Sequence, residues 1–160
     1  MQLIWFFGII IEINLIGKEK ENKMKQINQQ KIKVLHIDED RELARNTANI
    51  LCDNYENEIL EVPEDALEKV ESYMPDVIFL DLEFQDMRSG RYFKGGLSFL
   101  SILKSKTMTK DIPVVIIASD SDKEITKLCM KEGASGLIAK PLKNKDVYRL
   151  MKEIQLRGGK

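Results

Sequence analysis

Short apolar runs alternate with stretches in which apolar residues recur at helical spacing, from residue 32 toward the carboxyl end of the chain. The runs have the length of buried strands, and the stretches between them place their apolar residues on one helical face. Strands that alternate with helices are typical of an open parallel sheet covered by helices on both faces. The pattern predicts strands at 32–37, 58–62, 76–81, 113–118 and 137–139, with helical stripes in 42–52, 63–74, 97–103, 125–129 and 147–154.

Proline and glycine mark several of these boundaries. Pro63 stands where proline is tolerated at the start of a helix, and Pro75 ends the same helix. Gly133 lies where the carboxyl-terminal cap of a helix belongs. Residues 113–118 are continuously apolar, as expected of a strand that is covered on both faces.

Charged residues stand at the carboxyl ends of three predicted strands. Asp38 and Glu39 follow the first strand, Asp81 ends the third, and Lys140 follows the fifth. In an open parallel sheet the carboxyl ends share one edge, and ligands bind beyond that edge. Crowded carboxylates repel one another, and a bound cation relieves the repulsion. We therefore expect these side chains to meet and to hold a divalent cation and a phosphoryl group.

The stretch from about Ile32 to Ile154 resembles a response-regulator receiver domain of two-component signalling. The resemblance implies a flavodoxin-like, doubly wound α/β fold with a five-stranded parallel sheet in the order 2-1-3-4-5 and helices on both faces. It places a receiver domain at residues 32–157. Four motifs carry it, in the family's order: the acidic pair after the first strand, the segment Pro75–Asp81, Ile112-Pro113, and Gly133-Ala134 followed by Lys140-Pro141.

The resemblance also implies a role for each charged residue. Asp81 is expected to be the phosphoacceptor, and Lys140 to place its charge on a phosphate oxygen. Mg²⁺ is expected to bind Asp38 or Glu39. Its other ligands would be Asp81 and the backbone carbonyl of Glu83, because a hard ion suits carboxylates, carbonyls and phosphate oxygens. Plainer interpretations exist: residues 38–40 as a helix cap, Asp81 as a turn residue and Lys140 as a solvated loop lysine.

Two positions depart from the family's pattern. Where the family usually has Thr or Ser at the end of the fourth strand, this chain has Ala118, followed by Ser119. Without that hydroxyl the phosphate loses one hydrogen-bond donor. The Ser119 hydroxyl can substitute if the loop is shifted, and the Ser119 backbone N–H can still face the phosphate. The family's switch aromatic on the fifth strand falls at Leu137, which cannot mimic a Tyr hydroxyl. We expect both changes to weaken the usual switch more than the phosphorylation.

Residues 83–96 form a polar connection that is longer than the family's spacing. Loops of this kind lie on the surface and often carry recognition. The connection is either a tolerated insertion or a flap that contacts a partner or covers the site.

These features predict a single-domain response regulator and not a turnover enzyme. It would receive a phosphoryl group from a sensor histidine kinase or a histidine phosphotransfer protein and then bind a downstream protein. The alternative is a receiver-like binding module that works without phosphorylation, which Ala118 and Leu137 favour. No DNA-binding or enzymatic output domain is expected. The formal net charge of −1 gives no global field that would favour nucleic acid.

The other residues with reactive side chains give weaker signals. The single histidine, His36, lies in an apolar strand and is expected to be a packed side chain. Cys52 and Cys129 have no metal-ligand spacing and are expected to be reduced thiols.

Residues 1–31 differ from the rest of the chain. Residues 1–17 are apolar but carry Glu12, fall short of the ~20 residues that span a bilayer and lack the features of a secretory signal. Residues 18–31 read as a polar linker. Three interpretations stay open. The segment is an over-extended start with Met24 as the true start, or a disordered extension. It is a membrane anchor that holds the domain in the cytoplasm. Or it adds one helix or strand. The expected location is the cytoplasm, with or without membrane association.

Overall fold

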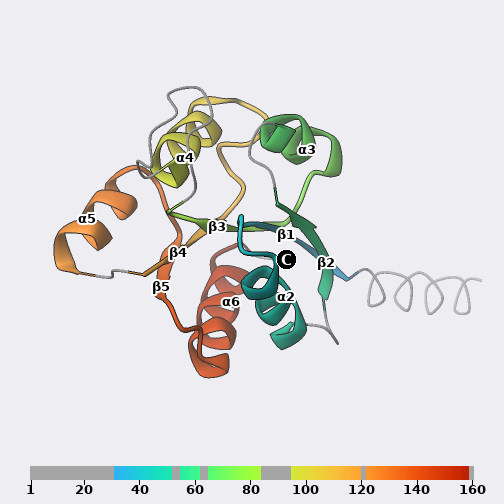
Figure 1. Cartoon of the computed structure of the whole chain (residues 1–160). Coiled ribbons are helices and arrows are strands. Elements are labelled where there is room, and N and C mark those ends of the chain that lie inside the picture. The colour runs from blue at the N-terminus through green and yellow to red at the C-terminus, as the bar shows by residue number, and fades with distance from the viewer. Residues whose placement is uncertain (1–30, 52–54, 62–64, 84–94, 120–121, 159–160) are drawn as a thin grey trace, which may run out of the picture. The chain divides into compact units, whose positions relative to one another are not determined.

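The computed structural model describes residues 31–51, 55–61, 65–83, 95–119 and 122–158. Contacts divide the chain into residues 1–31 and Ile32–Lys160, and the second unit carries the fold shown in Figure 1. The interpretations of residues 1–30 therefore fall outside the described residues. None of the helices in the described ranges is both long and apolar enough to cross a bilayer.

Five strands and five helices alternate in the described part of this unit. The strands pair in parallel in the order β2-β1-β3-β4-β5, which confirms the predicted fold class. The strands are β1 (Ile32–Ile37), β2 (Tyr55–Leu60), β3 (Val77–Asp81), β4 (Val114–Ala118) and β5 (Gly136–Ala139). The helices are α2 (Arg41–Ile50), α3 (Ala66–Tyr73), α4 (Gly95–Ser105), α5 (Lys123–Lys131) and α6 (Asn144–Gly158).

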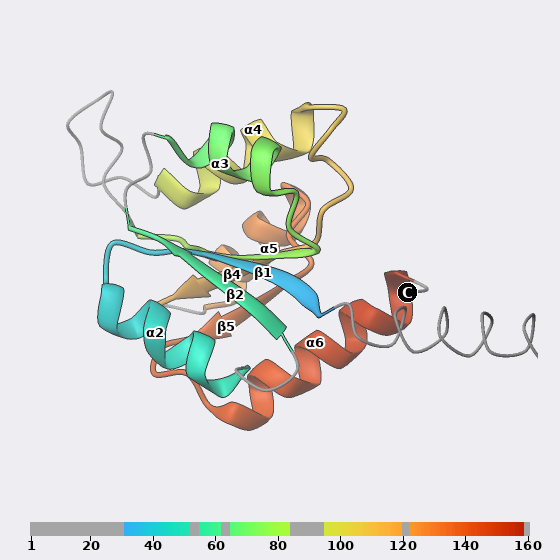
Figure 2. The ribbon, with the colours of Figure 1, turned by 90° about the vertical axis from the view of Figure 1, so that its right-hand side faces the viewer.

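Two apolar cores lie on the two faces of the sheet, because successive side chains of a strand point to opposite faces. One core packs Leu80 and Ile116 against residues of α3, α4 and α5. The other packs Phe79 and Val115 against residues of α2 and α6. Figures 1 and 2 show α3 and α4 above the sheet, and α2 and α6 below it. Every residue of β3 and β4 is buried, which explains their continuous apolar runs.

The second strand lies earlier in the chain than the apolar pattern predicts. β2 begins at Tyr55 and ends at Leu60, whereas the prediction was 58–62. It is an edge strand with only partly buried side chains, so charged residues are tolerated in it. Glu58 pairs with Lys69, and the Tyr73 hydroxyl donates to the Glu56 carboxylate at 3.2 Å. A hydrophobic pattern therefore misses the first half of this strand.

Two helix ends lie where proline and glycine predict them. Gly133 follows α5 with φ of 96°, a region that favours glycine because it has no Cβ. α3 ends at Tyr73, and Met74 takes φ of 49° immediately before Pro75. These turns end the helices and lead the chain into β5 and β3.

Gly96, in the first turn of α4, lies against the end of β3. A Cβ at this position would come within 2.1 Å of the Asp81 carbonyl oxygen and 2.7 Å of the Leu82 Cα. Real Cβ atoms do not approach backbone atoms this closely, so only glycine allows α4 to begin here. The Gly96 N–H also donates to the Leu82 carbonyl at 3.3 Å. The start of α4 thus fixes the backbone at Asp81.

We expect Gly96→Ala to lower the free energy of unfolding by about 2 kcal/mol or more, because backbone must move to admit the methyl group. Urea denaturation measures the change. Gly158→Ala is the matched control, since nothing lies within 4 Å of a Cβ there and alanine favours the helix. Equal stability of the two variants would contradict the close approach of α4 and β3.

His36 is a buried polar residue of the core, as the sequence predicts. Its ring stacks on Phe79 with centroids 5.4 Å apart, and its Nε2–H donates to Asn57 Oδ1 at 2.9 Å. The other ring nitrogen, Nδ1, is buried without a hydrogen-bond partner. Burial lowers the pKa of His36, and the hydrogen bond to Asn57 only partly opposes that shift. The folded protein therefore favours the neutral ring.

Because the unfolded chain takes up this proton near pH 6.5 and the folded protein resists it, His36 makes the free energy of unfolding fall as the pH drops below about 6.5. We expect His36→Leu to flatten that fall, whatever its stability at pH 7.5. Urea denaturation of both proteins between pH 7.5 and pH 5 measures the two slopes. Parallel slopes would mean that the folded protein accepts the proton.

Candidate functional site

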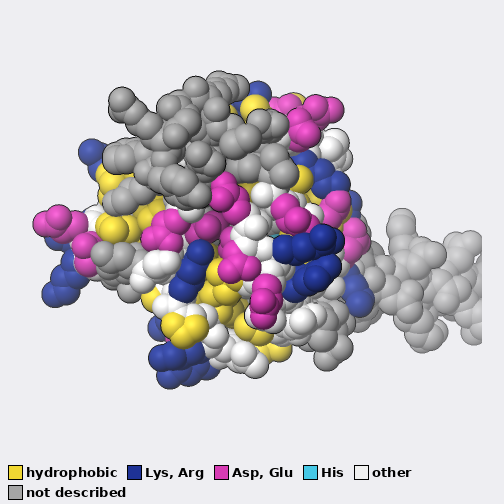
Figure 3. All heavy atoms as spheres, in the orientation of Figure 1, with side chains coloured by type: hydrophobic (Ala, Val, Ile, Leu, Met, Phe, Trp, Pro, Cys, Tyr) yellow, Lys and Arg dark blue, Asp and Glu magenta, His cyan; other side chains and the backbone are white. Residues whose placement is uncertain are grey.

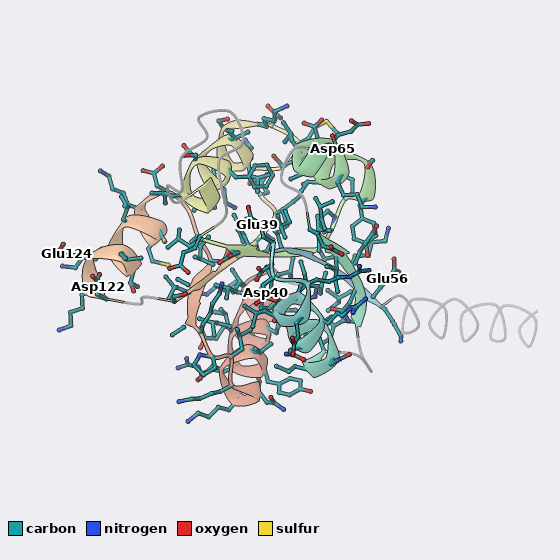
Figure 4. All side chains as sticks on the ribbon, in the orientation of Figure 1. Glu39, Asp40, Glu56, Asp65, Asp122 and Glu124 are labelled. Atoms are coloured by element: carbon teal, nitrogen blue, oxygen red, sulfur yellow. The ribbon has the colours of Figure 1, made fainter. Side chains whose placement is uncertain are left out.

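The carboxyl ends of the strands form the edge of the sheet at which the predicted residues meet. Figure 3 looks onto this edge and shows Asp and Glu side chains gathered near its centre. Figure 4 places Glu39 and Asp40 in the middle of the same face, on the loop from β1 to α2. Asp122 and Glu124 lie away from this centre, at α5.

Asp81 ends β3 and is almost completely buried, with 4% of its surface exposed. Its Oδ1 accepts a hydrogen bond from the Lys140 ammonium at 2.9 Å. The same oxygen accepts from the backbone N–H of Glu83 at 3.2 Å. Both donors fix the direction of the carboxylate, so Asp81 is more than a turn residue.

Asp38 lies beside this pair and is 3% exposed. Its Oδ1 accepts from the backbone N–H of Asp40 at 2.8 Å, but its Oδ2 is buried without a hydrogen-bond partner. Burial, together with the negative charge of Asp81, raises the pKa of Asp38 to about 6. The site therefore contains a buried carboxylate oxygen, Asp38 Oδ2, to which the protein offers no hydrogen-bond donor.

The helix-cap interpretation applies to only one of the three acidic residues. Asp40 is the N-cap of α2, and its Oδ1 accepts from the backbone N–H groups of Glu42 and Leu43, each at 3.0 Å. Asp38 instead faces the site, and Glu39 between them has an exposed side chain. The acidic run thus divides into one residue for the site, one on the surface and one for the helix.

Lys140 reaches the site from the end of β5. Burial disfavours its charge, but the hydrogen bond to Asp81 and the negative charges of Asp81, Asp38 and Glu83 outweigh that cost and raise its pKa. Its backbone N–H donates to the Ala118 carbonyl at 2.8 Å, which continues the pairing of β4 and β5. The Lys140 ammonium is therefore ion-paired with Asp81 at the site, and the interpretation of Lys140 as a solvated loop lysine does not apply.

These residues fit a hard divalent cation. The unpartnered Oδ2 of Asp38 and the nearby Asp81 carboxylate are oxygen ligands of the kind that Mg²⁺ prefers, and a cation would relieve their repulsion. Among the residues that the structure describes, no three His, Cys, Asp or Glu side chains form a ready metal cluster. Two carboxylates would thus need backbone carbonyl, water or phosphate oxygens to complete the coordination.

Ala118 and Ser119 occupy different environments at the end of β4. Ala118 is fully buried and belongs to the core formed with α3, α4 and α5. Ser119 is exposed, and its hydroxyl donates to Glu83 Oε2 at 2.5 Å. Leu137 is partly buried and packs against the same core as Ala118. The hydroxyl near the site therefore comes from Ser119, and it is bound to Glu83.

The sequence did not predict the roles of two residues at the site, Glu83 and Gly96. Glu83 was expected to offer only its backbone carbonyl, yet its carboxylate binds Ser119 and its charge acts on Lys140. Gly96 gave no signal beyond a glycine ahead of a helix, because its role depends on a backbone approach from β3. The two interpretations of the long connection, residues 83–96, stay predictions, because residues 84–94 lie outside the described residues.

Comparison with known proteins assigns most of the chain to one family. Residues 34–152 match the family model of the response regulator receiver domain. Two-component response regulator ORR8 of Oryza sativa subsp. indica is 38% identical over 89 residues, which are 53% of this chain and 74% of that protein. Two-component response regulator ARR15 of Arabidopsis thaliana is 41% identical over 64 residues, which are 40% of this chain but only 31% of that protein.

Solved structures match the fold over a longer span. The chemotaxis response regulator CheY4 of Vibrio cholerae superposes with a TM-score of 0.68 at 21% identity, over 78% of this chain and 99% of that chain. A two-component response regulator from Clostridium difficile gives a TM-score of 0.69 at 21% identity, over 81% of this chain and 100% of that chain. At these identities the likeness establishes the fold alone.

The burial of Asp38 predicts a cost to stability. The pKa of its carboxyl is about 6 in the folded protein and lower when unfolded, so its ionised form destabilises the fold above pH 6. We expect Asp38→Asn to raise the free energy of unfolding by about 1–3 kcal/mol at pH 7 without Mg²⁺. The gain should shrink toward pH 4, where the carboxyl is neutral in the folded protein and about half protonated in the unfolded chain.

Urea denaturation at pH 7 and pH 4, with and without Mg²⁺, tests this expectation. Mg²⁺ should stabilise the wild type and not Asp38→Asn. It should therefore narrow the difference between their free energies of unfolding. Asp65→Asn is the control, because Asp65 is exposed and makes no side-chain capping bond. A less stable Asp38→Asn at pH 7 would show that ionised Asp38 stabilises the fold.

Proposed function

The chain belongs to the response regulator receiver domain family, and on that premise we propose that it is a phosphoacceptor switch that carries its phosphoryl group on Asp81. One observation supports this above the others. The buried Asp38 Oδ2 lacks a partner beside an Asp81 carboxylate that Lys140 already holds. This arrangement offers a carboxylate oxygen to a cation and an ammonium to an anion, the two kinds of group that phosphoryl transfer requires.

The chemistry is a displacement at phosphorus. Oδ2 of Asp81, opposite the oxygen that Lys140 and Glu83 bind, forms a bond to the phosphorus of a phosphohistidine on a partner. The phosphorus–nitrogen bond breaks, and the imidazole leaves with that electron pair and takes up a proton from water. Lys140 stays charged at neutral pH because its pKa is raised, and it binds a phosphoryl oxygen.

Mg²⁺ is the cofactor of this proposal. Asp38, Asp81 and the backbone carbonyl of Glu83 would be its protein ligands, whereas the exposed Glu39 is the weaker candidate. When bound, the ion neutralises the charge that develops on the phosphoryl group. The protein itself supplies the fixed direction of Asp81, through its two donors and through the backbone contact with Gly96.

The proposed partners are a sensor histidine kinase or a histidine phosphotransfer protein as donor, and a downstream protein as target. A receiver domain is a signalling module, and we propose that this chain does not act as a turnover enzyme.

A surface formed by α5, β5 and α6 suits the target protein. It includes a cavity of about 240 Å³ whose lining contains Met130, Leu137, Leu150 and Arg149. Met130 is apolar but 44% exposed in this structure, as expected of a residue that a partner would bury in a complex.

A second candidate is a binding module that works without phosphorylation. It is favoured by Ala118, whose methyl group is packed in the core where a hydroxyl would be needed to report on phosphate. Leu137 likewise packs against that core and offers no hydroxyl. Both candidates share the fold and the partner surface, so phosphorylation itself separates them.

We expect the full chain to gain one phosphoryl group from acetyl phosphate in the presence of Mg²⁺, seen by intact mass and by phosphate-affinity gel mobility. Asp81→Asn should reduce the adduct to background because the nucleophilic oxygen is lost. A chelator should do the same. Asp111→Asn, an exposed aspartate after α4, should leave the adduct unchanged.

A folded wild type that forms no adduct would overturn the phosphoacceptor and favour the binding module. Ala118→Thr would then show whether the missing hydroxyl is the reason. An adduct that persists in Asp81→Asn would place the phosphoryl group on another residue.

A further inference from the structure

The register of the sheet brings Glu83 and Ser119 side by side. Asp81 pairs with Ile117 in the parallel ladder of β3 and β4. The Leu82 N–H donates to the Ile117 carbonyl at 2.8 Å, which continues that pairing past the end of β3. Two residues after the last pair stand Glu83 and Ser119, and the Ser119 hydroxyl donates to Glu83 Oε2 at 2.5 Å. The contact thus follows directly from the strand register.

Glu83 acts on donors that a phosphoryl group on Asp81 would need. Its carboxylate accepts from the Ser119 hydroxyl, and its negative charge contributes to the raised pKa of Lys140. Its backbone N–H donates to Asp81 Oδ1, so its side chain starts close to the phosphoacceptor. A carboxylate and a phosphoryl group repel each other when they share donors.

Among the described residues at the end of β4, Ser119 is the one that offers a hydroxyl. Ala118 has none, and its side chain is fully buried in the core. Glu83 has an exposed side chain, so its carboxylate can turn into water without leaving a charge buried. The release of Ser119 from Glu83 therefore has a low energetic cost.

We propose that the Ser119 hydroxyl exchanges partners on phosphorylation, leaving the Glu83 carboxylate and binding a phosphoryl oxygen on Asp81. This inference rests on the proposed function. Glu83 acts as an internal competitor that holds Ser119 while Asp81 is unmodified. Glu83 and Ser119 are thus positioning residues, and their exchange takes the place of a reporter hydroxyl at position 118.

The exchange predicts a specific pattern of affinities for beryllofluoride, a phosphoryl analogue that binds an aspartate with Mg²⁺ and does not hydrolyse. Ser119→Ala loses the hydrogen bond to the analogue. It also loses the bond to Glu83, which the wild type must break on binding, so the loss of affinity is partly offset. We expect a loss of affinity of a few-fold. Glu83→Gln removes the competing charge and should tighten binding several-fold.

The decisive comparison is Ser119→Ala within Glu83→Gln. Because Ser119 is no longer held by a carboxylate there, its removal should cost more than in the wild type, on the order of tenfold. Ser119→Thr keeps the hydroxyl and should bind almost as tightly as the wild type. Ser72→Ala removes an exposed hydroxyl that donates to Lys69, away from this site, and serves as control.

A purely structural contact between Glu83 and Ser119 gives the opposite pattern. Glu83→Gln and Ser119→Ala would then both weaken binding, and the second change would add nothing to the first. That result, or a Ser119→Ala variant with wild-type affinity in both backgrounds, overturns the exchange.

The same proteins are tested with acetyl phosphate and Mg²⁺, which separates this inference from the function on which it rests. A folded wild type that forms no adduct and binds no beryllofluoride overturns the proposed function, and the exchange with it. A wild type that forms the adduct on Asp81 but shows the structural pattern overturns the exchange alone.

Discussion

Two buried carboxylates beside one ammonium are the constraint on which this site depends. Asp81 is stabilised by Lys140 at 2.9 Å, but Asp38 keeps one buried oxygen without a partner. The negative charges of Asp38 and Asp81 destabilise each other, and burial strengthens the effect because little water remains to screen them. The apolar cores on both sides of the sheet must therefore offset the cost of the site. In the function that we propose, a cation would supply the partner that the Asp38 carboxylate lacks.

The parallel sheet turns this electrostatic arrangement into a defined geometry. Strand ends that are far apart in the sequence become neighbours, since β1 and β4 both pair with β3. The close approach of Gly96 to the Asp81 carbonyl fixes the backbone from the side of α4. The backbone pairing of Lys140 with Ala118 fixes it from the side of β5. The charged groups meet because rigid elements hold their backbones.

The departures from the family's pattern acquire a physical meaning in this setting. Ala118 is packed in the core, so the position that usually offers a hydroxyl is apolar. The neighbouring Ser119 offers one instead, but Glu83 already accepts its hydrogen bond. In the exchange that we propose, charge competition in the first residues beyond β3 and β4 replaces a direct hydroxyl contact. Leu137 packs against the core and offers no hydroxyl. On the proposed function, the chain keeps the residues for phosphoryl transfer, Asp38, Asp81 and Lys140, and differs at the two positions that would respond to it, Ala118 and Leu137.

The sequence by itself determined the fold class and the central residues of the site. Apolar runs and stripes predict the strands and helices because burial imposes their periodicity, and Asp38, Asp81 and Lys140 follow strands whose ends must share an edge. Only the tertiary structure decided which member of the acidic run enters the site, how far β2 extends, and what Glu83, Ser119 and Gly96 contact. Those properties depend on strand register, on edge position and on approaches between backbones distant in the chain, and local patterns do not encode them.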